Sequence, residues 1–127
     1  MNMIDTVRPI PIYTTSGATG GFLVYPYIYD AIGEWIGWVE EDRCVYSVIG
    51  HYVGWLDRDF RILRRRGEDF SHPNRTPPAR PEHFYPPATV PLPPMMAELK
   101  YETMDVLDEM PDLLPVYDAF SLPEDSD

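Results

Sequence analysis

The feature that most constrains this sequence is a repeat of about 17 residues built around two glycines. Each copy starts with a β-branched residue and an aromatic residue or leucine, and the first glycine follows after three more residues. A second glycine comes four residues later in IYDAIGEWIGWV (28–39) and VYSVIGHYVGWL (45–56). Self-similarity at a fixed period predicts repeated structural units. The copies span 12–23, 28–39, 45–56 and 62–73, with first glycines Gly17, Gly33, Gly50 and Gly67 and second glycines Gly21, Gly37 and Gly54.

Each copy has the pattern of a β-hairpin. In the third copy, Val45 and Tyr46 suit a half-buried strand, and Gly50 suits a turn that needs positive φ. The returning strand contains Gly54, which predicts a bulge or a close backbone approach. A single hairpin is marginal in water, so the copies need a shared core. We therefore expect a mainly β domain of about four hairpins, with a core built from Phe22, Tyr29, Trp38, Tyr46, Trp55 and their aliphatic neighbours.

The stretch GHYVGWLDRDFRILRRRG, with the preceding VYSVIG, resembles the four-fold β flower domain. Members of that family carry repeated Tyr–x–x–x–Gly–x–x–x–Gly–Trp-type hairpins in a pseudo-four-fold arrangement. The resemblance covers about residues 12–70. The fourth copy departs from the pattern, because Ser71 and His72 stand where other copies have glycine and an aromatic residue. The resemblance implies a fold but no established activity, so no catalytic residue can be carried over.

The rest of the chain divides by composition. Residues 1–11 form an N-terminal extension to the 12–72 hairpin domain. Nine of the 22 residues from 73 to 94 are proline, which favours an extended polyproline II segment. Such a segment is either a semi-rigid spacer or a strap lying over a partner or over its own domain. For a strap we expect four anchoring side chains, Phe84, Tyr85, Val90 and Leu92.

The C-terminal third combines apolar spacing with negative charge. Residues 95–110 have apolar residues on one helical face, which predicts a short amphipathic helix that ends before Pro111. Residues 111–127 alternate acidic and apolar residues, as in segments that become ordered on binding. Residues 98–127 hold ten acidic residues and one lysine, so most of the net charge of −11 lies there. We expect partner contacts at Phe84, Tyr85, Leu99, Leu107, Leu113, Leu114, Tyr117 and Phe120.

Several functional classes are disfavoured. The acidic balance argues against direct nucleic-acid binding. His51, His72 and His83 have no usual zinc spacing, and Cys44 has no second cysteine, so we expect no metal, no cofactor and no catalytic residues. The N-terminus lacks a signal-peptide pattern and no run reaches the length of a membrane span, which favours a cytoplasmic protein without membrane insertion. The basic run Arg64–Arg66 could bind phosphate or RNA, but neutralisation by the acidic tail or by an acidic partner fits the overall charge better.

These observations favour a non-enzymatic protein–protein interaction module, an accessory or structural subunit of a larger assembly. In this hypothesis the hairpin head and the C-terminal arm bind separate patches on proteins with a basic or apolar groove, and the arm becomes ordered only on its partner. Deleting 95–127 should then leave the head folded. One alternative is a small acidic inhibitor or immunity-type protein that blocks a basic groove. Another is glycan or ligand binding by exposed Trp35, Trp38 or Trp55.

Overall fold

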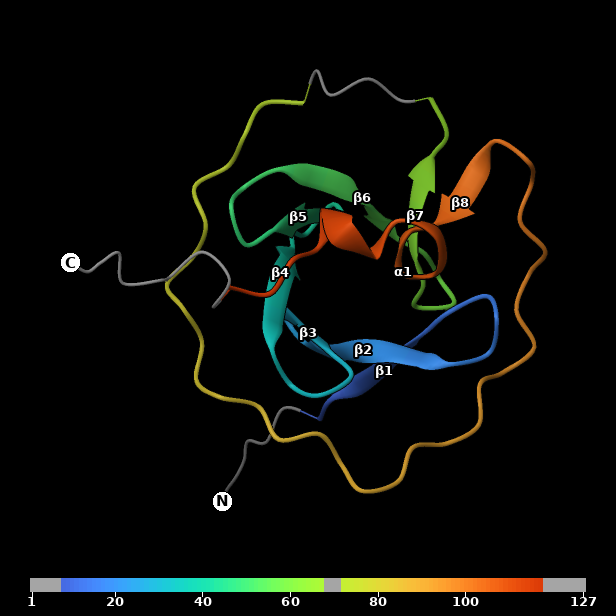
Figure 1. Cartoon of the computed structure of the whole chain (residues 1–127), viewed down its shortest axis with the longest axis horizontal. Coiled ribbons are helices and arrows are strands. Elements are labelled where there is room, and N and C mark those ends of the chain that lie inside the picture. Colours follow the sequence, from blue (N-terminus) through green and yellow to red (C-terminus); the bar gives the residue numbers. More distant parts are fainter. Residues whose placement is uncertain (1–7, 68–71, 118–127) are drawn as a thin grey trace.

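The computed structural model describes residues 8–67 and 72–117, and within them one eight-stranded antiparallel sheet forms the body (Figure 1). Each strand pairs with the next along the chain, so the sheet is a meander that curls on itself. The predicted mainly β fold is confirmed. The strands are β1 (Ile10–Tyr13), β2 (Thr19–Val24), β3 (Tyr27–Asp30), β4 (Trp35–Val39), β5 (Cys44–Ser47), β6 (Tyr52–Leu56), β7 (Ile62–Arg65) and β8 (Thr103–Asp105).

The first and second glycines of the repeat have the roles that their spacing predicts. The first glycine has φ of 98°, 95°, 90° and 72° in copies one to four, the left-handed region that favours glycine. The second lies against the backbone of the neighbouring strand: a Cβ at Gly37 would overlap the Tyr46 carbonyl oxygen, and one at Gly54 would overlap that of Leu63. The register also shifts by a β-bulge in each of the first three hairpins. The turn and bulge predictions are therefore confirmed.

The two faces of the sheet differ in chemistry, because side chains alternate along each strand. The inner face of the curl is aliphatic, and its buried residues form the main core: Ile12, Leu23, Ile28, Ile36, Val39, Val45, Val53, Leu56, Ile62, Val106 and Leu114. The predicted aromatic core is therefore wrong in its placement. Tyr29 and Tyr46 follow Ile28 and Val45 directly, so they lie on the other face, where Tyr46 stacks on Trp38 with ring centroids 5.4 Å apart.

A strap formed by residues 72–102 covers that outer, aromatic face. Figure 1 shows it as the yellow-to-orange trace that encircles the sheet. Of the two alternatives for the proline-rich segment, a spacer or a strap, the structure shows a strap over its own domain. The strap has no strand or helix of its own, which fits its proline content.

The strap is attached to every hairpin in turn. It contacts the third hairpin where the Arg75 amide donates to the Gly50 carbonyl (2.9 Å). It reaches the second at Phe84, whose ring stacks on Tyr29 with centroids 4.9 Å apart. At the first hairpin, the Tyr13 hydroxyl donates to the Pro91 carbonyl (2.7 Å). The strap thus passes around the ring against the chain order before it meets the fourth hairpin.

The fourth hairpin is closed by a distant part of the chain. The sequence of the fourth copy departs from the pattern after Gly67, and there β7 pairs with β8, from Leu63 opposite Asp105 to Arg65 opposite Thr103. The decay of the fourth copy therefore marks an insertion, because the whole strap lies between its two arms. The ring of four hairpins is completed within one chain.

The predicted helix over 95–110 is wrong in extent. Residues 95–102 belong to the strap, and only α1 (Val106–Glu109) is helical, followed by the 3-10 helix η1 (Pro111–Leu113). Asp105 caps α1 by accepting from the Asp108 amide. Neither helix in the described ranges has the length and apolar character needed to cross a lipid bilayer.

The prediction of an arm that becomes ordered only on a partner is also wrong for the described part of the tail. Val106 is fully buried and Leu114 is 4% exposed, both within the main core. Their side chains fill the open end of the curled sheet, which the four hairpins alone would leave exposed to water. Deleting 95–127 would remove one strand and two core residues, so the hairpin head is not independent of this segment.

Candidate functional site

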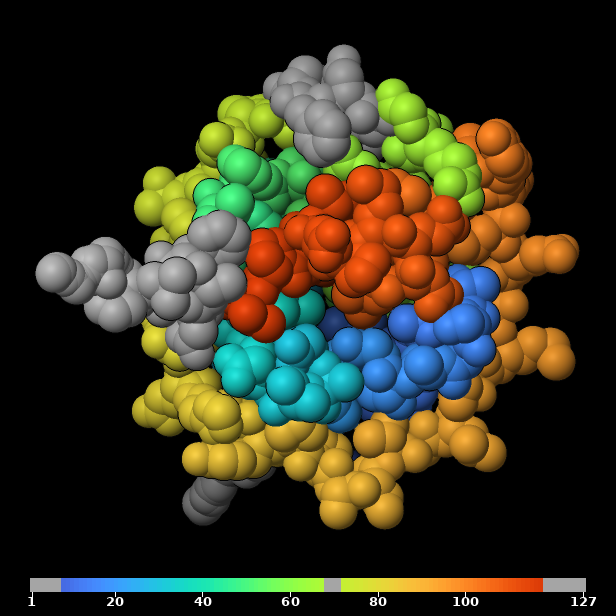
Figure 2. Space-filling view, in the orientation of Figure 1, coloured from blue at the N-terminus to red at the C-terminus, as the bar shows by residue number. Residues whose placement is uncertain are grey.

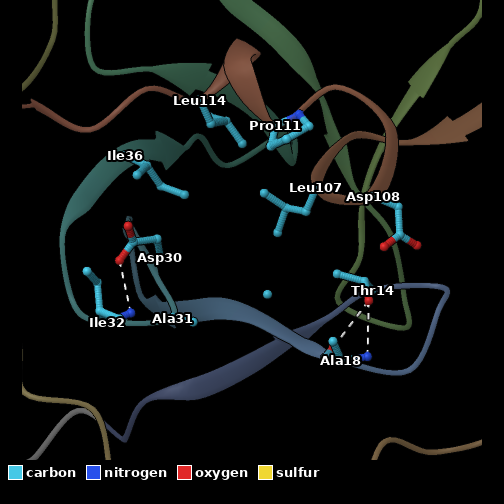
Figure 3. Close-up of a pocket in the computed structure, with 11 residues that line it drawn as sticks. Thr14, Ala18, Asp30, Ala31, Ile32, Ile36, Leu107, Asp108, Pro111 and Leu114 are labelled. Carbon is cyan, nitrogen blue, oxygen red and sulfur yellow. Dashed lines mark hydrogen bonds between the residues drawn. The ribbon is translucent and has the colours of Figure 1, made fainter. Parts of the chain in front are cut away.

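An open cleft lies where the C-terminal segment crosses the first two hairpins, and we call it the hairpin-tip cleft. It has a volume of about 490 Å³. In Figure 2 it lies at the boundary between the orange-to-red segment and the blue and cyan hairpins. Its lining residues are Thr14, Ala18, Gly20, Asp30, Ala31, Ile32, Ile36, Leu107, Asp108, Pro111 and Leu114 (Figure 3).

The walls of the cleft are apolar. Ile36 comes from β4, Leu107 from α1, and Leu114 directly follows η1; all three point toward the cavity (Figure 3). Ile36 occupies the bulge of the second hairpin, since the pairing passes from Gly37 to Trp35 without it. Leu107 lies over Gly20, where a Cβ would collide with its Cδ1 atom. The glycine-rich first copy therefore makes room for the leucine that forms one wall.

The second hairpin turn forms one rim. Its conformation is held by Asp30, whose Oδ1 accepts from the amides of Ile32 (3.0 Å) and Glu34 (2.9 Å). Gly33 takes the positive φ that closes this turn. Ile32 is left 73% exposed at the tip, next to the apolar walls. At so exposed a turn position, the isoleucine side chain gains little stability from burial within the chain.

The opposite rim is held by Asp108 of α1, whose carboxylate accepts from the Ser16 amide (2.9 Å) and hydroxyl (2.8 Å). Beside it, Asp105 accepts from the Thr15 amide (2.7 Å) and hydroxyl (2.8 Å). These four bonds join the last strand and α1 to the first hairpin turn, and we call them the seam. Burial raises the pKa of Asp105, and the nearby Asp108 charge adds to this, although the Thr15 hydrogen bonds oppose it.

The chemistry of the cleft is that of a binding surface. Its walls can take an apolar group, and Asp30 and Asp108 place negative charge on the rims without any basic residue in the lining. Both carboxylates already accept hydrogen bonds from the chain. Among the described residues, no group of three or more His, Cys, Asp or Glu side chains is placed to hold a metal ion.

The residues predicted to contact a partner are divided between several places. Leu107 and Leu114 line the cleft. From the strap, the Phe84 ring packs against Phe22 and Tyr29 and acts as the predicted anchor, whereas Tyr85 is 79% exposed, so its predicted anchor role is wrong. Leu113 packs against the main core.

The remaining predicted contacts lie elsewhere. Leu99 is half-buried in the last part of the strap. Tyr117 lies against Trp35, with ring centroids 5.1 Å apart, and under the guanidinium of Arg80. Phe120 lies outside the described residues. Six of the eight predicted residues therefore have contacts within the chain, and partner binding by any of them stays a prediction.

Two of the three arginines in the basic run have partners within the chain. Arg66 forms a two-pronged ion pair with Glu109, with nitrogen–oxygen distances of 2.9 and 3.0 Å, so neutralisation by the acidic tail is confirmed for this residue. Arg64 is buried and donates to the Val53 carbonyl. Glycan binding, the other alternative, would need exposed tryptophans. Trp35 and Trp38 are each only 5% exposed, so they do not offer such a surface.

Sequence patterns did not identify the rim residues Asp30 and Ile32 or the wall residue Ile36. One signal could have found the rim. The residue before the positive-φ glycine is Ser16, Ile32, Ile49 and Arg66 in the four copies, so two hairpin tips carry isoleucine where polar residues are usual. The cleft itself could not be found, because its other wall comes from residues more than 70 positions later in the chain.

The chain matches a known protein family. The family model described as "4-fold beta flower protein" matches residues 10–107, which includes the strap and β8 as well as the hairpins. Comparisons with curated proteins and with solved structures found no match.

Proposed function

The chain belongs to the 4-fold β flower family, and we propose that it is a non-enzymatic protein–protein interaction module whose hairpin-tip cleft takes an apolar side chain of a partner protein. The observation that carries the proposal is the combination of an open apolar cleft with Ile32, 73% exposed, on its rim. Exposed apolar patches with polar rims are typical of protein contact sites.

The charge of the molecule indicates the kind of partner. The chain has a net charge of −11, and Asp30 and Asp108 lie on the two rims of the cleft. A partner with an apolar residue flanked by lysine or arginine would match both the walls and the rims. Charge complementarity of this kind mainly accelerates association and selects the partner.

The curled sheet, whose fourth hairpin is completed by β8 of the same chain, suits an accessory subunit that offers one preformed surface to a larger assembly. Because Cys44 is the single cysteine, the fold needs no disulfide, which supports a cytoplasmic location. For the inhibitor alternative, insertion of the tail into a basic groove from Leu114 onward would require Leu114 to leave the main core. The cleft proposal requires no such rearrangement.

The test compares two matched variants in a pull-down with the full-length protein. Ile32→Ser removes the apolar rim residue, and Ile49→Ser makes the same change at the tip of the third hairpin, outside the cleft. Proteins retained by the wild type and by Ile49→Ser, but lost with Ile32→Ser, are the expected partners.

The affinity for such a partner is then measured with purified proteins. Burying an isoleucine side chain contributes about 1.5–3 kcal/mol, so Ile32→Ser should weaken binding about 10- to 100-fold. Equal affinity of Ile32→Ser and wild type for every retained protein would show that the cleft is not the contact site.

A further inference from the structure

The part of the strap between residues 90 and 99 shows a three-residue periodicity of burial. Val90, Pro93, Met96 and Leu99 are half-buried against the body, and the residues between them are exposed. Three residues per turn is the repeat of the polyproline II helix. This period, together with the prolines at 91, 93 and 94, indicates a polyproline II helix with one edge on the protein and two edges facing solvent.

The exposed edges carry a regular apolar pattern. Pro91 and Leu92 are followed three residues later by Pro94 and Met95, so two proline–apolar pairs lie in register along the solvent side. Leu92 is 89% exposed and Met95 is 99% exposed, the two most exposed large apolar side chains of the described chain. The segment from 86 to 97 contains no charged residue. Neither packing within the chain nor solubility explains such a surface.

The body holds this segment at both ends. At one end the Tyr13 hydroxyl donates to the Pro91 carbonyl (2.7 Å). At the other, the Ala97 amide donates to Asp59 (3.1 Å) and the Ala97 carbonyl accepts from Arg61 (3.0 Å). The five residues between these points keep their extended conformation before any partner binds. Preordering of this kind lowers the entropic cost of binding.

We propose that residues 90–95 are a ligand for a protein domain with an aromatic-lined groove that recognises polyproline II. Such grooves bind P-x-x-P segments through their preformed helical shape, and Pro91–Leu92–Pro93–Pro94 has that spacing. The absence of charge from 86 to 97 favours an apolar groove over a charged one. This surface lies on the strap, and none of its residues lines the hairpin-tip cleft, so the two proposals can fail separately.

The test is a titration of the ¹⁵N-labelled full-length protein with two probes, an SH3 domain and a WW domain. We expect at least one probe to cause saturable amide shifts at Val90, Leu92 and Met95. The double variant Pro91→Ala/Pro94→Ala should bind that probe at least tenfold more weakly. Pro87→Ala is the matched control, because Pro87 is exposed on the strap but lies outside the segment.

Several outcomes would overturn the proposal: no saturable shift with either probe, shifts confined to residues outside the strap, or equal binding by the double variant. Alanine at position 91 keeps the carbonyl that Tyr13 binds, so the strap should stay attached. If that variant nevertheless misfolds, Leu92→Asp/Met95→Asp replaces it, since both side chains lie almost wholly in solvent. Ile32→Ser should bind the probe as the wild type does.

Discussion

The variant Asp105→Ala tests whether the hydrogen bonds of the seam hold the last strand to the first hairpin turn. Asp105 is 2% exposed and accepts two short hydrogen bonds from Thr15. Hydrogen bonds to a charged acceptor contribute about 1.5–3 kcal/mol each, so two contribute about 3–6 kcal/mol. Removing a buried carboxylate also relieves its desolvation, the effect that raises its pKa. We therefore expect Asp105→Ala to lower the free energy of unfolding by about 2–4 kcal/mol.

Urea unfolding at neutral pH, followed by tryptophan fluorescence, measures this difference. The matched control is Asp108→Ala, which removes the other two seam bonds at an exposed position and should cost below about 1 kcal/mol. A loss of less than 1 kcal/mol for Asp105→Ala, or equal losses for the two variants, would refute the reasoning. The ring would then depend on the apolar core alone.

The pH dependence of unfolding gives a second test of the role of Asp105. The folded pKa of Asp105 lies above its unfolded value of 3.8. The folded state therefore binds more protons than the unfolded state between these two pKa values, and the contribution of Asp105 to stability falls as pH rises through that window. The stability difference between wild type and Asp105→Ala should be larger near pH 4 than at pH 7. A difference that grows with rising pH would contradict the raised pKa.

Three further variants or measurements probe the rest of the fold. Gly37→Ala would drive a Cβ into the Tyr46 carbonyl oxygen and should cost about 2–3 kcal/mol in urea unfolding; a loss below 0.5 kcal/mol would contradict the close approach. Phe84→Ala should lower the free energy of unfolding by about 1.5–2.5 kcal/mol, roughly half the value for a fully buried phenylalanine, and should raise hydrogen exchange in the strap. The control Tyr85→Ala, at a 79% exposed position, should do neither. Burial is the main cause of the raised pKa of Cys44, so its thiol should react with iodoacetamide at pH 8 more slowly than in 6 M urea, and equal rates would count against this.

The hairpins could be predicted because their determinants are local. Gly33 and Gly50 reveal a turn by their spacing from the strand residues before them, and Gly37 and Gly54 reveal a close approach by their place within a strand. Alternation of side chains across a strand depends on the same short stretch of sequence. These features do not require knowledge of which strands lie side by side.

Which face of each strand points to the interior depends on the rest of the molecule, and the sequence-based prediction of an aromatic interior was wrong. Alternation shows that Val45 and Tyr46 point to opposite sides, but it does not show which side is enclosed. The aliphatic side became the interior because the curl brings those residues together, and the strap then covered the aromatic side. Residues 95–110 have helical spacing, yet Thr103–Asp105 pairs with β7. This pairing satisfies backbone N–H and C=O groups of the β7 edge, which a helix over the same residues would leave unpaired.

By itself the sequence determined three hairpins with glycine at their turns, the first strand of a fourth, a segment too rich in proline to join a central sheet, and an acidic C-terminal third. Each of these features depends on residues a few positions apart. Only the tertiary structure decided that the strap encircles its own body, that β8 completes the fourth hairpin, and that Leu107 and Leu114 form walls of the cleft. Those outcomes depend on contacts between residues tens of positions apart, and the free energy of such contacts is set by the surfaces that folding brings together.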